Sequence, residues 1–129
     1  MIIIIGLPGS GKTYLMNQFN MKIYDDFISN FFNGELIDEL NENKDICIAD
    51  PRLCDKEIFL KYMEVIEEIV DKSQISLILY KNNKEQCLIN SKHRNRKKVE
   101  TTIERLSKIY NPYDEIYMKY KNEIIDVFY

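Results

Sequence analysis

Residues 6–13, which read GLPGSGKT, constrain the possible folds of this chain more than any other stretch. They fill every fixed position of the G-x-x-x-x-G-K-[ST] phosphate-binding loop, whose backbone N–H groups surround phosphate oxygens. Four isoleucines at 2–5 precede the loop and are typical of a buried parallel strand, and residues 12–19 can continue from it as a helix. Because strand, loop and helix occur in the required order, the chain is predicted to be an α/β protein built around a nucleotide site. An incidental Gly/Pro turn is the alternative, and this context disfavours it.

The loop residues have distinct expected roles. Lys12 should reach the β- and γ-phosphates of a nucleoside triphosphate, and the Thr13 hydroxyl should coordinate Mg²⁺. The glycines allow the backbone amides to converge, and the helix N-terminus adds the positive end of its dipole. ATP and Mg²⁺ are therefore the predicted cofactors, and the predicted nucleotide-binding residues are Gly6, Leu7, Pro8, Gly9, Ser10, Gly11, Lys12 and Thr13.

Composition limits the class of protein. The chain has 129 residues, 45% hydrophobic and 30% charged, which favours a single domain over 1–129 without a long disordered arm. Its formal charge of -3 excludes a global positive field that would attract nucleic acid, so any polyanion contact should be local. No apolar run approaches membrane-spanning length, and we expect a cytoplasmic protein, in the host cytoplasm if it is viral. Cys47, Cys54 and Cys87 fit neither a zinc spacing nor a disulfide framework.

Carboxylates follow two further predicted strands at the point where each strand ends. Residues 21–24 run into Asp25 and Asp26, and residues 45–49 run into Asp50. Ligands bind at the carboxyl ends of parallel strands, so we expect these groups on the same edge as the phosphate loop. Asp50 is predicted to hold Mg²⁺ through water. Turn formation is the alternative for Asp50, and helix capping is the alternative for Asp25 or Asp26.

The rest of the chain predicts helices and two more strands. Gln74 to Tyr80 should return beside the first strand, and Glu123 to Phe128 should close the sheet as an edge strand. Four helices are expected: one through Phe27, Ile28, Phe31 and Phe32; a short one with Leu36, Ile37 and Leu40; a long one from Asp55 to Asp71 with Ile58, Tyr62, Val65, Ile66 and Ile69 inward; and one with Ile103, Leu106, Ile109 and Tyr110 inward. Asn83 and Gln86 form a plausible capping box for a further helix.

Residues 92–98 form a basic cluster, KHRNRKK, between two predicted helices. Two helices with an arginine-rich junction suggest a lid at about 90–100. The planar guanidinium groups of Arg94 and Arg96 suit phosphate oxygens, so both are predicted to close over the triphosphate. The lysines are better explained as a solvated helix end, and His93 as a surface residue without a visible partner.

Together these motifs resemble the small P-loop kinases related to the kinase domain of polynucleotide 5′-kinase, including compact members from bacteriophage genomes. The resemblance covers most of the chain and implies a three-layer fold with a five-stranded parallel sheet ordered 2-3-1-4-5 and a helical lid. It also implies that Asp25 takes the proton from the accepting hydroxyl, and it matches the lid arginine to Arg94. The chain departs from the family where arginines should hold the acceptor's phosphate, since it has Tyr24 before the Asp pair and Phe27-Ile28 after it.

The leading hypothesis is an ATP-dependent, Mg²⁺-assisted phosphotransferase that moves the γ-phosphoryl to a hydroxyl of a nucleotide or nucleic-acid end. Lys12, Asp25, Arg94 and Arg96 are its predicted catalytic residues, and Thr13 and Asp50 its predicted metal-binding residues. A nucleotide-binding module or slow ATPase with a degraded acceptor site is one alternative, and a toxin-type sugar-nucleotide kinase is another. Few cations remain for an acceptor, so no extended nucleic-acid groove is expected, and the acceptor is predicted to stack on Tyr24 or Phe27.

Overall fold

The computed structural model describes residues 1–30, 34–92 and 97–128, and it contains a five-stranded sheet. The strands are β1 (Ile2–Ile5), β2 (Lys22–Asp25), β3 (Ile46–Ala49), β4 (Ser76–Tyr80) and β5 (Lys121–Ile125). Their order is β2-β3-β1-β4-β5, and every neighbouring pair is parallel. This is the order that the family resemblance implied.

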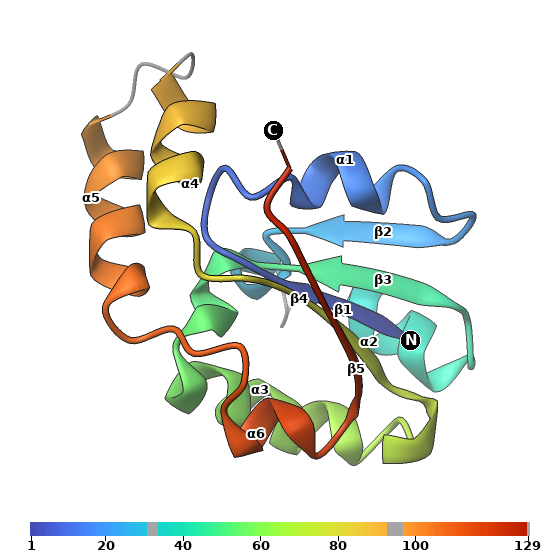
Figure 1. Cartoon of the computed structure of the whole chain (residues 1–129). Coiled ribbons are helices and arrows are strands. Elements are labelled where there is room, and N and C mark those ends of the chain that lie inside the picture. The colour runs from blue at the N-terminus through green and yellow to red at the C-terminus, as the bar shows by residue number, and fades with distance from the viewer. Residues whose placement is uncertain (31–33, 93–96, 129) are drawn as a thin grey trace.

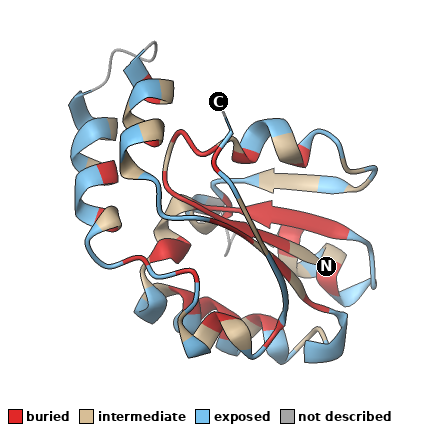
Figure 2. Cartoon of the chain, in the orientation of Figure 1, coloured by how far each residue is buried: buried red, intermediate tan, exposed pale blue. Residues whose placement is uncertain are grey.

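The burial of each strand matches its position in the sheet. Ile3, Ile4 and Ile5 of β1 and all four residues of β3 are fully buried, as expected for β-branched runs in the middle of a parallel sheet. The edge strands β2 and β5 have partly exposed side chains, and β5 begins with three exposed polar residues. Charged edges of this kind oppose pairing with another chain. Figure 2 shows the resulting gradient, with red central strands and paler edges.

The helices form two layers around the sheet, with a third group at its end. Helix α1 (Lys12–Met16) lies on one face, while α2 (Glu35–Asn41), α3 (Lys56–Glu67) and α6 (Glu115–Met118) lie on the other (Figure 1). Helices α4 (Lys84–Ser91) and α5 (Lys97–Ser107) lie side by side and project beyond the carboxyl end of β4. Short 3₁₀ helices cover Phe27–Asn30 (η1), Pro51–Cys54 (η2) and Lys72–Gln74 (η3).

Side-chain caps fix the starts of several helices, among them the helices expected to begin at Asp55 and Asn83. Asp55 accepts a hydrogen bond from the Glu57 amide at the start of α3, and Asn83 accepts one from the Gln86 amide at the start of α4. These bonds satisfy amides that have no partner within the helix. Both start positions are confirmed.

Several predicted boundaries are wrong. Helix α1 ends at Met16 rather than 19, α3 ends at Glu67 rather than 71, and the segment after Asp26 is a 3₁₀ helix. Phe31 and Phe32 lie outside the described residues. The buried stripe of α3 is Phe59, Tyr62, Met63 and Ile66, so Ile58 and Val65 are only half-buried. Ile109 was expected inward but is 49% exposed. Strand β5 starts at Lys121 and ends at Ile125.

Candidate active site

The phosphate loop joins β1 to α1 at the carboxyl edge of the sheet. Gly9 and Gly11 have φ values of 84° and 106°, in the left-handed region that favours glycine. A Cβ atom at Gly9 would lie 2.6 Å from the Cys87 carbonyl oxygen, so α4 also requires glycine here. A cavity of about 340 Å³ opens beside the loop, and it is lined by Pro8, Gly9, Gly11, Lys12, Thr13, Tyr14, Asp25, Asp26, Pro51 and Val99. Residues from the loop, the ends of β2 and β3, and α5 thus meet at one cavity.

The Lys12 ammonium folds back into the loop. Its Nζ donates to the carbonyl oxygens of Gly6 and Leu7 at 2.7 and 2.8 Å, and it lies 3.4 Å from Ser10 Oγ. Burial lowers the pKa of Lys12, although nearby acidic groups, including Asp25, oppose this effect. The cation is held by dipoles rather than by a direct ion pair, so it can exchange these carbonyls for phosphate oxygens.

Thr13 and the two acids at the end of β2 form a polar cluster on the cavity wall. The Thr13 hydroxyl donates to Asp25 Oδ2 at 3.0 Å, and the Asp26 amide donates to Asp25 Oδ1 at 3.0 Å. Asp26 has a φ of 49°, which directs the chain sharply after the strand. Desolvation, the Asp25 charge and the Asp50 charge raise the pKa of Asp26. Hydroxyl and carboxylate oxygens are ligands that Mg²⁺ prefers, so this donor set fits the predicted metal.

Asp50 has other partners than those predicted. It is fully buried, and Arg52 donates to it through its amide, Nε and a terminal guanidinium nitrogen at 2.8–2.9 Å. The Ile28 amide donates to its second oxygen at 3.2 Å. Four donors thus occupy the carboxylate, which caps η2 and is absent from the cavity lining. The structure shows the turn that the sequence left as the alternative, and a water-mediated metal role for Asp50 stays a prediction.

The outer rim of the loop is held by residues that the sequence did not identify. The Asn90 side-chain amide donates to the Gly9 carbonyl oxygen at 2.8 Å and to the Phe128 carbonyl oxygen. The Phe128 amide donates to the Ser10 carbonyl oxygen at 3.0 Å, and the Tyr80 hydroxyl donates to that of Gly11 at 3.0 Å. The loop residues and their donors are 69 to 118 residues apart in the chain, so no local pattern signals these contacts. Asn90 stood out only where the family resemblance leads us to expect an arginine.

Comparison with known proteins finds a relative that is encoded by a virus. It is 40% identical over 135 residues to Uncharacterized protein R277 of Acanthamoeba polyphaga mimivirus, and the match covers 99% of this chain and 96% of the relative. The chain belongs to the family of that mimivirus protein. No protein-family model matches it. A virus thus carries one member of the R277 family, while a bacteriophage origin stays a prediction.

A solved structure identifies the fold of this chain. The chain is similar to a gluconokinase from Sinorhizobium meliloti 1021, with a TM-score of 0.62 over 98% of this chain and 81% of that one. Sequence identity is 12%, so the likeness establishes the fold alone. The R277-family chain therefore has the P-loop kinase fold, with the sheet order expected for it.

The lid stays a prediction in the structure of this R277-family chain. Helix α5 brings Val99 to the cavity, so the hairpin of α4 and α5 borders the phosphate loop. Arg94, Arg96 and His93 lie outside the described residues, and their predicted roles stay predictions.

Within the described ranges, no helix is long and apolar enough to cross a membrane. The three cysteines are buried and unbridged.

The predicted stacking of an acceptor on Phe27 is wrong, and stacking on Tyr24 stays a prediction. Phe27 is 1% exposed and packs edge-on against Tyr62 in the core. Neither Tyr24 nor Phe27 lines the cavity. The exposed aromatic rings beside the loop are instead Tyr14 and Phe128, whose centroids lie 4.4 Å apart.

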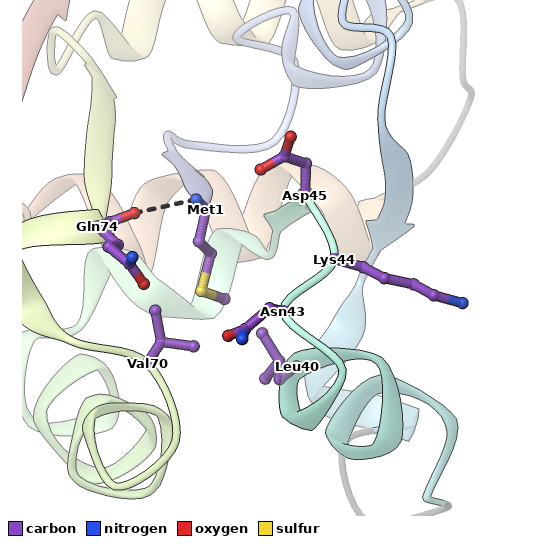
Figure 3. Close-up of a pocket in the computed structure, with 7 residues that line it drawn as sticks. All are labelled: Met1, Leu40, Asn43, Lys44, Asp45, Val70 and Gln74. Carbon is purple, nitrogen blue, oxygen red and sulfur yellow. Dashed lines mark hydrogen bonds between the residues drawn. The ribbon is translucent and has the colours of Figure 1, made fainter.

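A second cavity, of about 390 Å³, lies at the opposite edge of the sheet. Met1, Leu40, Asn43, Lys44, Asp45, Val70 and Gln74 line it (Figure 3). Met1 and Asp45 directly precede β1 and β3, and Gln74 ends the 3₁₀ helix that precedes β4, so this cavity is at the amino ends of the strands. Parallel α/β sheets bind ligands at the carboxyl ends. In the R277-family chain, the cavity beside the phosphate loop is therefore the candidate active site.

Proposed function

We propose that the chain is an ATP-dependent, Mg²⁺-assisted phosphotransferase that moves the γ-phosphoryl of ATP to a hydroxyl of a nucleotide or nucleic-acid end. The observation that carries the proposal is the hydrogen bond from Thr13 to Asp25 on the wall of the cavity. It places an acid at the end of β2 beside the phosphate loop, where a general base could reach an acceptor hydroxyl. The P-loop kinase fold supports the proposal, and the whole chain would form one kinase-like domain.

In the proposed reaction, Asp25 orients the acceptor hydroxyl and accepts its proton. The hydroxyl oxygen forms a bond to the γ-phosphorus, the bond from that phosphorus to the β–γ bridging oxygen breaks, and ADP leaves with the electron pair. Lys12 would leave the carbonyls of Gly6 and Leu7 to contact the β- and γ-phosphates. Mg²⁺ bound at Thr13, with Asp25 beside it, would neutralise charge that develops on the phosphate oxygens. Arg94 and Arg96 would add cations as the lid closes.

The acceptor side of the cavity favours a small acceptor. In the described part of the lining, the only basic side chain is Lys12, and Asp25 and Asp26 are acidic. Arg52 is near Asp26, but its guanidinium binds Asp50 and Ser29. We expect the acceptor to be a single nucleotide or the terminal residue of a strand. Binding of longer oligonucleotides should therefore have a shallow salt dependence, because only one or two phosphate contacts would each contribute about −0.7 to the log–log slope.

The same charge pattern supports a second candidate, a nucleotide-binding module that only hydrolyses ATP slowly. An anionic acceptor lacks a free cation among the described lining residues, while the donor loop is complete. Incubation with γ-labelled ATP distinguishes the two candidates, with an acceptor panel of nucleosides, nucleotides, 5′-hydroxyl oligonucleotides and gluconate. Label on an acceptor supports the kinase. Label released only as phosphate supports the module, and retention of all label on ATP contradicts both.

Substitution of the two acids identifies the base. Asn caps about as well as Asp and tolerates positive φ, but it cannot accept a proton. Asp25→Asn should lower transfer by roughly 10²–10⁴-fold while ATP affinity is kept. Asp26→Asn should have a smaller effect, and Asp45→Asn, at the far edge of the sheet, is the matched control. Full transfer by the Asp25 variant together with loss in the Asp26 variant would move the base to Asp26.

A further inference from the structure

Three successive carbonyl groups of the phosphate loop are bonded by donors from outside the loop. The donors are the Asn90 side chain on the Gly9 carbonyl, the Phe128 amide on the Ser10 carbonyl and the Tyr80 hydroxyl on the Gly11 carbonyl. They come from three different elements: α4, the tail after β5, and the end of β4. The tail crosses beside the loop (Figure 1).

The geometry of a trans peptide gives these bonds a consequence for the neighbouring amides. In each peptide unit the C=O of one residue and the N–H of the next point in opposite directions, and the unit is rigid. A carbonyl held on the outer side therefore turns the following N–H to the inner side. The Phe128 amide fixes the N–H of Gly11 in this way, and the Tyr80 hydroxyl fixes the N–H of Lys12. Gly11 and Lys12 both line the cavity.

Close packing keeps the outer donors in place. A Cβ atom at Gly11 would lie 2.6 Å from Phe128 Cβ, and one at Gly6 would lie 2.9 Å from the Tyr80 ring. Tyr80 is 1% exposed, and burial raises its pKa to about 12, so its hydroxyl remains a donor at neutral pH. Asn90 is itself oriented by Gln86, which donates to its side-chain oxygen at 2.8 Å.

We propose that Tyr80 and the Phe128 backbone amide are positioning groups for the donor phosphates, because they aim the Lys12 and Gly11 amides into the site, and that Asn90 supports them by holding the Gly9 and Phe128 carbonyl groups. This inference rests on the proposed nucleotide-binding role of the loop and adds residues that lie outside it. An amide nest that is preset in this way binds phosphate without reorganisation. The tail after β5 is accordingly a working part of the site.

The first test removes one hydroxyl. Tyr80→Phe is compared with Tyr117→Phe, since the Tyr117 hydroxyl is also buried and donates to a backbone carbonyl, that of Leu53. Affinity for pyrophosphate is measured by titration calorimetry, because pyrophosphate lacks a base that could contact Tyr14 or Phe128. Tyr80→Phe should weaken binding by about 2- to 12-fold, the range for one net hydrogen bond, and Tyr117→Phe should leave it unchanged. Equal affinities in the two variants would overturn the proposal.

The second test addresses the backbone amide. Phe128→Pro removes the N–H that bonds the Ser10 carbonyl, whereas Phe128→Ala removes the ring and keeps the N–H. Only the proline variant should lose pyrophosphate affinity. For the side-chain amide, Asn90→Asp keeps the shape but cannot donate and should weaken binding, whereas Asn90→Gln keeps a donor and should restore part of it. A proline variant with the affinity of the alanine variant would contradict the role of the tail.

A ligand-free measurement separates this inference from the proposed function. In ¹⁵N NMR spectra, Tyr80→Phe should shift the Lys12 amide, and Phe128→Pro should shift the Gly11 amide, each more than the matched control does. Unchanged amide signals would overturn the inference even if the wild-type protein transfers phosphate. If the variants shift these amide signals as expected and the wild-type protein binds pyrophosphate but transfers no phosphate, only the proposed phosphotransferase activity is refuted.

Discussion

The buried pair of Asp50 and Arg52 makes a quantitative prediction about stability. Arg52→Met removes two charge-assisted hydrogen bonds from a carboxylate that is fully buried, and leaves it only the amides of Arg52 and Ile28. Such bonds contribute about 1.5–3 kcal/mol each, but the Arg52 side chain is 39% exposed, so water offsets part of the loss. We expect the free energy of unfolding to fall by about 3 kcal/mol, near the lower end for a broken buried pair. For a chain of this size the melting temperature should fall by about 10 °C.

A double-mutant cycle isolates this interaction. Asp50→Asn should cost about 2 kcal/mol, because an amide keeps one acceptor oxygen but places N–H groups against other donors. The double variant should be less destabilised than the sum of the two single variants, with a coupling of about 2 kcal/mol by urea unfolding. If the stability losses of the two single variants simply add, an interaction between Asp50 and Arg52 is refuted. The same Asp50→Asn protein tests the metal prediction, since a structural Asp50 leaves the Mg²⁺-dependent gain in ATP affinity unchanged and a metal-supporting Asp50 does not.

The other predictions concern the loop and its surroundings. Lys12→Met should abolish triphosphate binding in calorimetry without lowering stability at neutral pH, because a cation buried among carbonyls is replaced by an apolar side chain. The pKa of Lys12 is lowered in the folded state, so the unfolded chain binds more protons between that pKa and 10.5. In this pH range the free energy of unfolding of the wild type should therefore rise with pH relative to that of the variant. A difference in stability between the two proteins that does not change with pH would contradict this. Thr13→Ala should keep metal-free ATP binding but lose the gain from Mg²⁺, and a wild-type Mg²⁺ response would count against the Thr13 ligand. Ser91→Ala should raise the free energy of unfolding by about 1 kcal/mol, because the buried Ser91 hydroxyl has no hydrogen-bond partner among the described residues, and a loss of stability would show an unseen partner.

The sequence predicted the sheet well because its signals are local. Residues 2–5 and 45–49 are apolar runs that end in loop residues, and such runs are buried wherever a parallel sheet forms. Helix α3 was predicted in the right place, and Tyr62 and Ile66 point inward as expected, but the rest of its inward face was predicted wrongly. Its sequence has apolar residues on several sides, and only contact with the sheet selects Phe59 and Met63 over Ile58 and Val65.

The candidate site could be predicted only where its residues are close in sequence. The loop motif identified Lys12 and Thr13, and the end of a strand identified Asp25, which the structure brings to the same cavity. The partners of Asp50 include Arg52, two residues away, and that spacing was a signal that could have been used. Tyr80 and Asn90 have no such signal, because their contacts to the loop depend on how the whole chain folds.

The bond between Ser10 and Phe128 also orders events during synthesis. The phosphate loop is synthesised before the rest of the sheet, and the donor on its Ser10 carbonyl follows 118 residues later. Strand β5, which shortly precedes that donor, pairs with β4 and so docks onto a sheet whose other strands are already synthesised. Contacts that close so long a loop form late and slowly. A nascent chain therefore holds the motif long before it can hold a triphosphate, and nucleotide cannot template the early steps of its folding.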